Sequence, residues 1–221
     1  MSEKRMAAFF DFDNTLLVKD SAVIGIKYLF RKGDISFWFV LGIIMRSILY
    51  KLHLYSAERI SRYALRFYKN RDISEYLEQA ERYYHEMLKP HISSRVMERL
   101  EEHRRQGHLL ILITASLRYM LEPVVKDLKF DRLLCTDLEI DENGLPTGRP
   151  IEPICVGENK VIYAKKAAME MNIDLERSYA YTDHHSDIPL LKLVGNPVVV
   201  NPSFFLRRAA VKNNWPILEH F

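Results

Sequence analysis

The chain has 221 residues, of which 48% are apolar and 28% are charged. This composition is typical of a soluble globular protein, and the length suits one large domain or a core with a smaller insertion. Lys and Arg number 32 against 29 Asp and Glu, so the net charge is only +3. We therefore expect no nucleic-acid partner, because such a partner requires a clustered basic surface.

The N-terminus and the two cysteines indicate the cellular compartment. The charges of residues 3–5 precede an apolar run that is too short for the core of a secretory signal. Cys135 and Cys155 have neither metal-binding nor redox spacing, and we expect both to be reduced thiols. The sequence therefore predicts a cytoplasmic protein, and it defines no oligomeric state.

The first predicted element is a buried strand over residues 7–10, with the sequence Ala-Ala-Phe-Phe. Asp11 and Asp13 follow it directly, although aspartate is a poor strand residue and strands usually end in turns. A turn or a cap would explain one carboxylate at the end of an apolar strand more easily than two. The pair is therefore a candidate functional site.

Residues 20–89 have little strand signal and marked helical periodicity, and Pro90 ends them. Within them, residues 37–50 are mostly apolar, but a charge at Arg46 leaves the run too short to span a membrane. One interpretation is a buried helix, or two, of a cap. The alternative is a segment on a membrane surface, flanked by Arg31, Lys32, Arg46 and Lys51.

Helices and strands alternate along the rest of the chain. The first is a helix capped by Ser93 or Ser94, with Val96, Leu100 and His103 inward, and it stops at Gly107. The remaining expected elements are a strand over 109–114, a helix through Met120, Val124 and Leu128, a strand over 132–140, a hairpin over 141–148, a helix over 159–171, a strand over 179–182, a helix over 188–194 capped by Asp187, and a last strand over 196–200.

This alternation predicts an α/β fold with a Rossmann-like, doubly wound and mostly parallel sheet. Residues 1–18 and 91–221 would form the core, and residues 19–90 would be a helical cap inserted after the first strand. Strands this apolar are expected to be covered by helices on both faces. In such sheets the ligand binds beyond the carboxyl ends of the strands.

Six polar side chains should therefore meet at one edge of the sheet: Asp11, Asp13, Thr114, Lys160, Asp183 and Asp187. Crowded carboxylates raise one another's pKa, and a divalent cation with oxygen ligands relieves the repulsion. Mg²⁺ held by carboxylates, water and a substrate phosphate suits this set. A carboxylate can also attack a phosphoryl group, whose oxygens hydroxyl, N–H and ammonium groups then stabilise.

The same residues resemble the four motifs of the haloacid dehalogenase superfamily, in order and across nearly the whole chain. The motifs are Asp11-Phe-Asp-Asn-Thr15, Leu110-Ile-Leu-Ile-Thr114, Lys160 and Asp183-His-His-Ser-Asp187. The helical insertion and the segments 195–202 and 214–217 resemble the phosphoserine phosphatase-like branch, subfamily IB. The resemblance implies a Mg²⁺-dependent phosphomonoester hydrolase with an aspartyl-phosphate intermediate. Asp13 argues against a dehalogenase, which needs neither a second aspartate nor a metal.

The resemblance also implies a role for each motif residue. Asp11 would be the nucleophile, and Asp13 would protonate the leaving oxygen and later deprotonate the attacking water. Thr114 and the N–H of Ala115 would bind phosphoryl oxygens, while Lys160 would neutralise Asp11 and the phosphate. The implied Mg²⁺ ligands are Asp11, Asp13 through its backbone carbonyl, Asp183 and Asp187.

The substrate is less defined than the reaction. Asp20 stands where phosphoserine phosphatases of this branch carry a Glu that faces the substrate ammonium, and its shorter side chain weakens that assignment. We expect a small phosphorylated metabolite. The alternatives are a membrane-surface lipid phosphatase of the phosphatidylglycerophosphatase type and a non-catalytic module that binds a phosphate or a partner. His184 and His185 are interpreted as loop residues, because Mg²⁺ prefers oxygen ligands.

Overall fold

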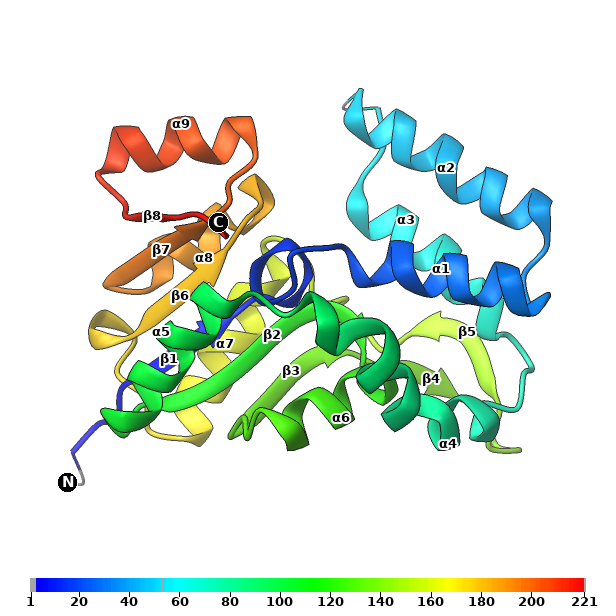
Figure 1. Ribbon diagram of the computed structural model, residues 1–221, viewed down its shortest axis with the longest axis horizontal. Helices are drawn as coiled ribbons and strands as arrows, with labels where there is room; N and C mark the ends of the chain where they lie inside the picture. The colour runs from blue at the N-terminus through cyan, green and yellow to red at the C-terminus, as the bar shows by residue number, and fades with distance from the viewer. Residues whose placement is uncertain (1–2, 53, 221) are drawn as a thin grey trace.

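The computed structural model describes residues 3–52 and 54–220 (Figure 1). Its main sheet has six strands in the order β3-β2-β1-β6-β7-β8, and every neighbouring pair is parallel. The strands are β1 (Ala7–Phe10), β2 (Leu109–Leu117), β3 (Arg132–Thr136), β6 (Tyr179–Thr182), β7 (Asn196–Val200) and β8 (Ile217–Leu218). The predicted α/β fold with a parallel sheet is confirmed, and β1 lies between β2 and β6.

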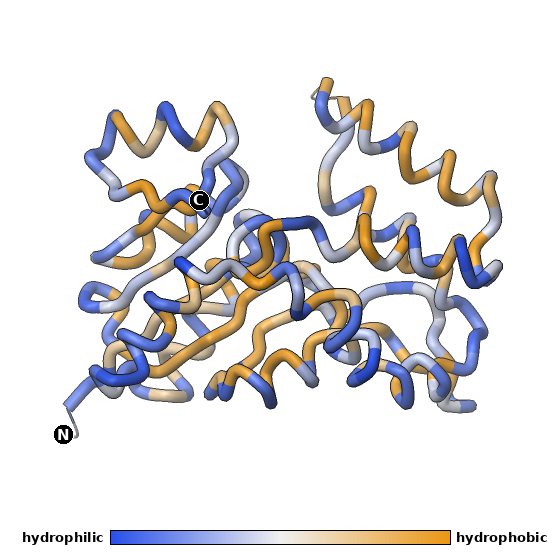
Figure 2. The backbone as a smooth tube through the Cα atoms, in the orientation of Figure 1, coloured by the Kyte–Doolittle hydropathy of each residue, from blue (hydrophilic) through white to orange (hydrophobic). Residues whose placement is uncertain are grey.

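Helices cover both faces of this sheet. Side chains of β1 point alternately to the two faces, so Ala7 and Phe9 join one apolar cluster while Ala8 and Phe10 join the other. In Figure 1, α5 (Ser94–Arg105) and α6 (Arg118–Asp127) lie in front of the sheet, and α7 (Asn159–Glu170) lies behind it. The helices α8 (Ile188–Leu193) and α9 (Phe204–Asn213) contribute to the same cluster as α7. In Figure 2 the strands are the most continuously hydrophobic part of the core.

In the described part of the segment between β1 and α5 lie four α-helices: α1 (Ser21–Lys32), α2 (Phe37–Lys51), α3 (Ala57–Leu65) and α4 (Ser74–Tyr83). Short helical turns complete the chain at Phe12–Leu16, Arg66–Tyr68, Tyr84–Leu88, Lys89–His91, Leu175–Arg177 and His185–Asp187. The helices α1, α2 and α3 stand together beyond the sheet (Figure 1). The helix α4 and the turn that follows it pack on α6, where the Tyr84 hydroxyl donates to Asp127 at 2.6 Å. The domain limits at residues 18 and 91 stay a prediction.

Two strand predictions were wrong. The strand expected over 132–140 breaks at Asp137, whose carboxylate accepts two hydrogen bonds from Arg118 at 2.7 and 2.8 Å. Beyond the break, β4 (Leu138–Ile140) leaves the main sheet and pairs with β5 (Pro146–Pro150) in the predicted hairpin. The strand over 196–200 is not the last one either, because β8 pairs with Val199 and Val200.

The helix α2 has apolar side chains on both sides. Only Ile43 is buried in it, so the interpretation as a buried helix holds for one side alone. The other side exposes Phe37, Trp38, Ile44, Met45 and Ile48, with exposed fractions of 46–75%. Within the described residues, no helix has the combination of length and hydrophobicity that a membrane crossing requires. Contact of this face with a membrane surface stays a prediction.

A buried histidine lies where α5 packs against β6. His103 of α5 is 4% exposed, and its two ring nitrogens are hydrogen-bonded at 2.8 Å to His108 and to the Tyr181 hydroxyl. Burial, reinforced by the neighbouring His108, lowers the pKa of His103 to about 4. The folded protein therefore holds this imidazole neutral.

We expect acid to destabilise the protein through His103. The unfolded chain takes up a proton near pH 6.5 and the folded chain only near pH 4, so stability is full above pH 6.5 and falls as the pH drops between these values. The contribution lost is about 3 kcal/mol. Urea unfolding of wild type and His103→Gln from pH 7.5 to pH 4 measures this contribution to the free energy of unfolding. Parallel pH profiles of the two proteins would contradict the prediction.

Candidate active site

Asp11 lies at the centre of the sheet edge, directly after β1. Its backbone N–H donates to Tyr181 O of β6 at 2.9 Å, which continues the sheet pairing by one residue. Its side chain is 7% exposed, with one carboxylate oxygen 2.7 Å from the N–H of Phe12 and the other 2.9 Å from Nζ of Lys160. The sheet and these two donors thus fix the orientation of this carboxylate.

Lys160 joins Asp11 to Asp187. The ammonium group at the start of α7 is 3% exposed and lies 2.7 Å from Oδ2 of Asp187, which also accepts from the Thr182 hydroxyl at 2.7 Å. Burial opposes its charge, but Asp11 and Asp187 raise the pKa of Lys160 above its usual value. Asp187 precedes α8 without making a capping hydrogen bond, so the predicted cap is wrong: its carboxylate is committed to Lys160 and Thr182.

The carboxylates of this cluster crowd one another. Burial, together with Asp187 and Asp183, raises the pKa of Asp11 well above its usual value despite Lys160. Burial and the neighbouring Asp187 likewise raise the pKa of Asp183 to about 7. For Asp187 burial acts in the same direction, but the charge and hydrogen bond of Lys160 keep its pKa below the usual value. One lysine therefore balances only part of the negative charge.

Asp13 lies in the tight turn that follows Asp11. The turn places Asn14 at φ +52°, in the left-handed region that Asn tolerates better than most residues. The Asp13 carboxylate accepts from the N–H of Ser21 at 2.6 Å and from the Ser116 hydroxyl at 3.0 Å. Burial, followed by the nearby charge of Asp20, raises the pKa of Asp13 to about 6. A carboxyl group with this pKa can be protonated or ionised near neutral pH.

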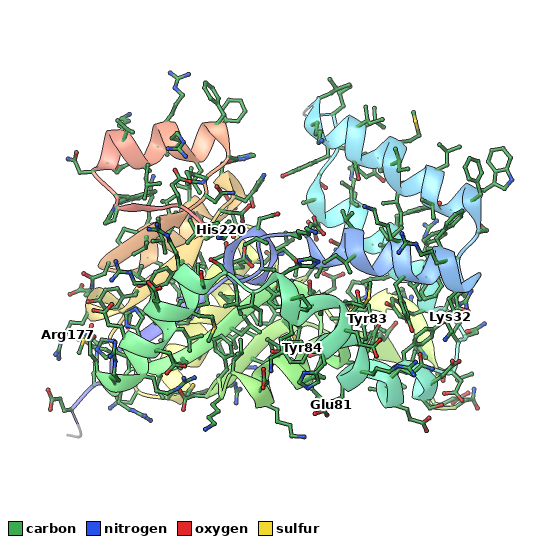
Figure 3. The ribbon with its side chains drawn as sticks, in the orientation of Figure 1. Lys32, Glu81, Tyr83, Tyr84, Arg177 and His220 are labelled. Atoms are coloured by element: carbon green, nitrogen blue, oxygen red, sulfur yellow. The ribbon has the colours of Figure 1, made fainter. Side chains whose placement is uncertain are left out.

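His220 braces the same turn from the far end of the chain. One ring nitrogen lies 2.9 Å from the carbonyl oxygen of Asn14 and the other 3.0 Å from the Ser93 hydroxyl. Figure 3 labels His220 beside the turn. The four sequence motifs do not include His220, because a histidine near the chain end has no local signal that ties it to Asn14.

Thr114 and Ala115 lie next to this cluster, but not at the end of their strand as predicted. The strand β2 continues to Leu117, and the buried Thr114 hydroxyl accepts from the N–H of Ser116 at 3.1 Å. Ser21, Ser116 and Thr182 were missed as partners of the carboxylates. Ser116 had one usable signal, since it follows Thr114 by two residues and shares its side of the strand.

A cavity of about 370 Å³ opens from Asp13 into the space enclosed by α1, α2, α3, α4 and α6. Asp13, Asp20, Ala115 and Ser116 are among its lining residues. Asp20 caps α1 by accepting from the N–H of Val23 at 3.1 Å. The cavity thus begins at Asp13, two residues after Asp11, and extends into the interior of the helical segment.

His184 links α2 to the loop that carries Asp183 and Asp187. Its Nε2 lies 3.3 Å from the Tyr50 hydroxyl, and its Nδ1 accepts from the N–H of Ser186 at 3.2 Å. The ring of His185 lies against Phe205 of α9, with centroids 5.7 Å apart. The loop interpretation holds for His184, which also contacts α2, but it was wrong for His185, which begins the helical turn His185–Asp187.

The donor set suits a hard cation. Among the described residues, no three His, Cys, Asp or Glu side chains form a ready-made metal-binding group, and the Asp13 carboxylate is turned toward Ser21 and Ser116. Mg²⁺, however, usually takes only one or two carboxylates and completes its shell with water and phosphate. The raised pKa values of Asp11 and Asp183 report excess negative charge that such a cation would balance. The four metal ligands stay a prediction.

Comparison with known proteins identifies the family. The sequence model of the haloacid dehalogenase-like hydrolases matches residues 8–192. The phosphoserine phosphatase SerB1 of Mycobacterium tuberculosis is 31% identical over 219 residues, covering 96% of this chain and 70% of the relative. A histidinol-phosphatase of Neisseria meningitidis is 27% identical over 227 residues, covering 96% of this chain and 97% of the relative.

Solved structures agree with this assignment. A protein of unknown function from Bordetella pertussis Tohama I superposes with a TM-score of 0.89 at 26% identity, covering 99% of this chain and 100% of that one. A substrate-bound phosphoserine phosphatase shares the fold, with a TM-score of 0.67 at 16% identity over 100% of this chain and 95% of that one. Fold and relatives together define a hydrolase. The chain belongs to the haloacid dehalogenase-like hydrolase family and is phosphoserine phosphatase-like within it.

Proposed function

We propose that the protein is a Mg²⁺-dependent phosphomonoester hydrolase that works through an aspartyl-phosphate on Asp11. The observation that carries the proposal is the placement of this carboxylate, fixed at the centre of the sheet edge and 2.9 Å from Lys160. Its relatives include a phosphoserine phosphatase and a histidinol-phosphatase, which favours a small phosphorylated substrate. Relatives named as hydrolases and phosphatases argue against a non-catalytic binding module.

Each side chain has a step in this reaction. A carboxylate oxygen of Asp11 attacks phosphorus, and the ester P–O bond breaks as Asp13 protonates the leaving oxygen. Asp13, now ionised, takes a proton from the water that attacks the phosphoryl group and releases Asp11. Thr114, the N–H of Ala115 and Lys160 stabilise the phosphoryl oxygens throughout. Bound Mg²⁺ would be held by Asp11, Asp183, Asp187 and the backbone carbonyl of Asp13, and it would neutralise phosphoryl charge.

Removal of divalent metal tests this proposal. We expect 4-nitrophenyl phosphate to be hydrolysed in Mg²⁺ buffer, turnover to stop after treatment with EDTA, and added Mg²⁺ to restore it. Added Ca²⁺ is a control, because it binds oxygen ligands with a looser geometry than Mg²⁺ and should restore much less. Hydrolysis that persists unchanged in EDTA would contradict the metal role.

The exposed face of α2 favours a second candidate, a lipid phosphatase at a membrane surface. Phe37, Trp38 and Met45 are at least half exposed on this face, and Lys51 lies at the C-terminal end of the helix. An apolar helix face with basic flanks is typical of interfacial helices. The reaction at Asp11 would be the same, and only the presentation of the substrate would differ.

A further inference from the structure

The cavity beside Asp13 is large and mainly apolar. Its volume of about 370 Å³ is enough for the organic part of a small-molecule ligand. Its apolar and aromatic lining includes Leu29, Phe39, Ile43, Leu65, Phe67 and Tyr68. Several of these side chains also form one packed cluster with the buried Ile35, which keeps the walls of the cavity ordered. Whatever is esterified to the phosphate at Asp11 would lie in this space.

The charges of the cavity have one sign. Its described lining includes Asp13 and Asp20 but no Lys, Arg or His. An alcohol that carries a carboxylate would therefore place it without a cationic partner near two carboxylates, and burial of an unpaired charge is strongly unfavourable. An ammonium group, in contrast, could be paired by Asp20.

The hydroxyl groups of the cavity are largely satisfied by the protein. Tyr68 and Tyr119 bond to each other at 2.7 Å, and Tyr28 donates to Gln79 at 3.2 Å. The Tyr83 hydroxyl differs, because it is buried with no hydrogen-bond partner in the described part of the chain. Figure 3 labels Tyr83 below α1, and its ring contacts that of Tyr28 at 5.2 Å. The cavity thus offers a substrate mostly ring faces and aliphatic groups, together with the unpartnered hydroxyl of Tyr83.

We propose that the substrate is a phosphomonoester of an alcohol with an apolar or aromatic body and without a carboxylate. This inference rests on the proposed phosphomonoester hydrolysis at Asp11. This substrate class excludes phosphoserine, because the carboxylate of phosphoserine would lie near Asp13 and Asp20 without a cationic partner. It covers both a soluble alkyl or aryl phosphate and a single-chain lipid phosphate, because the cavity would recognise the same chemistry in each.

Matched substrate pairs test the inference, with kcat/KM as the measured quantity. We expect O-phosphoethanolamine to exceed phosphoserine by about tenfold or more, because the two differ only in the carboxylate. From ethyl to hexyl phosphate, we expect a rise of about fourfold per methylene until the cavity is filled. A higher value for phosphoserine than for both phosphoethanolamine and hexyl phosphate would overturn the inference.

Two further measurements distinguish a soluble substrate from a lipid substrate, and failure of the inference from failure of the proposed function. Lysophosphatidate in phosphatidylcholine vesicles is compared with hexyl phosphate in solution, and preference for either over phosphoserine supports the inference. Turnover of 4-nitrophenyl phosphate together with preference for phosphoserine would overturn the inference and leave the proposed function intact. Absence of turnover with every ester, including 4-nitrophenyl phosphate, would overturn both.

A cation placed in the cavity should reverse the preference. Leu29 lines the cavity, whereas Phe30 is the next residue of α1 and is 47% exposed. We expect Leu29→Lys to lower kcat/KM for hexyl phosphate at least tenfold and to raise it for phosphoserine, because the ammonium group pairs with the carboxylate. Phe30→Lys is the matched control and should change neither. Equal effects of the two variants would contradict the placement of the substrate body in the cavity. If Leu29→Lys does not fold, the comparison of esters with the wild-type protein decides the inference.

Discussion

Replacement of Asp11 by Asn is expected to reduce hydrolysis of 4-nitrophenyl phosphate by about 10⁴-fold or more, a typical cost of removing a covalent nucleophile. The amide is neutral and cannot form the acyl phosphate. The side chains are nearly equal in size, and burial raises the pKa of Asp11 well above its usual value. Loss of this charge removes repulsion from Asp183 and Asp187, so the midpoint of thermal unfolding should not fall.

The comparison needs a control with the same chemical change. Asp72 is exposed and its carboxylate accepts from the N–H of Ser74 at 2.8 Å, a contact that Asn can keep. Asp72→Asn should therefore leave both turnover and unfolding unchanged. If Asp11→Asn retained wild-type turnover, the nucleophile would have to be another group. Preserved folding with lost turnover would separate catalysis from stability.

The architecture was predictable where one physical rule dominates. Residues 7–10 and 109–114 are continuous apolar runs, which parallel strands covered on both faces require, and both lie in interior strands of the main sheet. The break at Asp137 was not predictable, since it depends on Arg118 from another element. The strand β8 has only two residues, and its pairing with Val199 and Val200 depends on tertiary contact rather than on its own pattern.

The candidate site was predictable to the level of its charged residues. Carboxylates at the ends of apolar strands are conspicuous, and the motifs placed Asp11, Lys160 and Asp187 together before the fold was known. The hydrogen-bond partners of these charged groups were harder to predict from the sequence. Ser21 reaches Asp13 through a backbone N–H, which any residue except proline could supply. Thr182 reaches Asp187 only because the chain after β6 folds back over the end of the strand. The apolar cavity depends on the packing of five helices and has no sequence signature.

Replacement of Lys160 is expected to lower both stability and turnover. In metal-free buffer at pH 7.5, Lys160→Met should lower the free energy of unfolding by about 3–5 kcal/mol, because it leaves buried carboxylates at Asp11 and Asp187 without their cation. Methionine resembles lysine in the length of its apolar stem but carries no charge, so the loss of stability reports the missing charge. Turnover should also fall, since the ammonium group balances phosphoryl charge. Urea unfolding and 4-nitrophenyl phosphate hydrolysis measure the two effects.

The pH dependence of this loss identifies its cause. Without Lys160, the folded-state pKa of Asp11 rises further above its unfolded value, and Asp187 loses the charge that keeps its pKa below the usual value. The variant therefore gains stability relative to wild type as the pH falls and the carboxylates take up protons. The deficit at pH 7.5 should therefore narrow toward pH 5. Lys165→Met on the exposed side of the same helix is the control, and its free energy of unfolding should stay within about 0.5 kcal/mol of wild type. A deficit for Lys160→Met that is independent of pH would assign the loss to packing and not to charge.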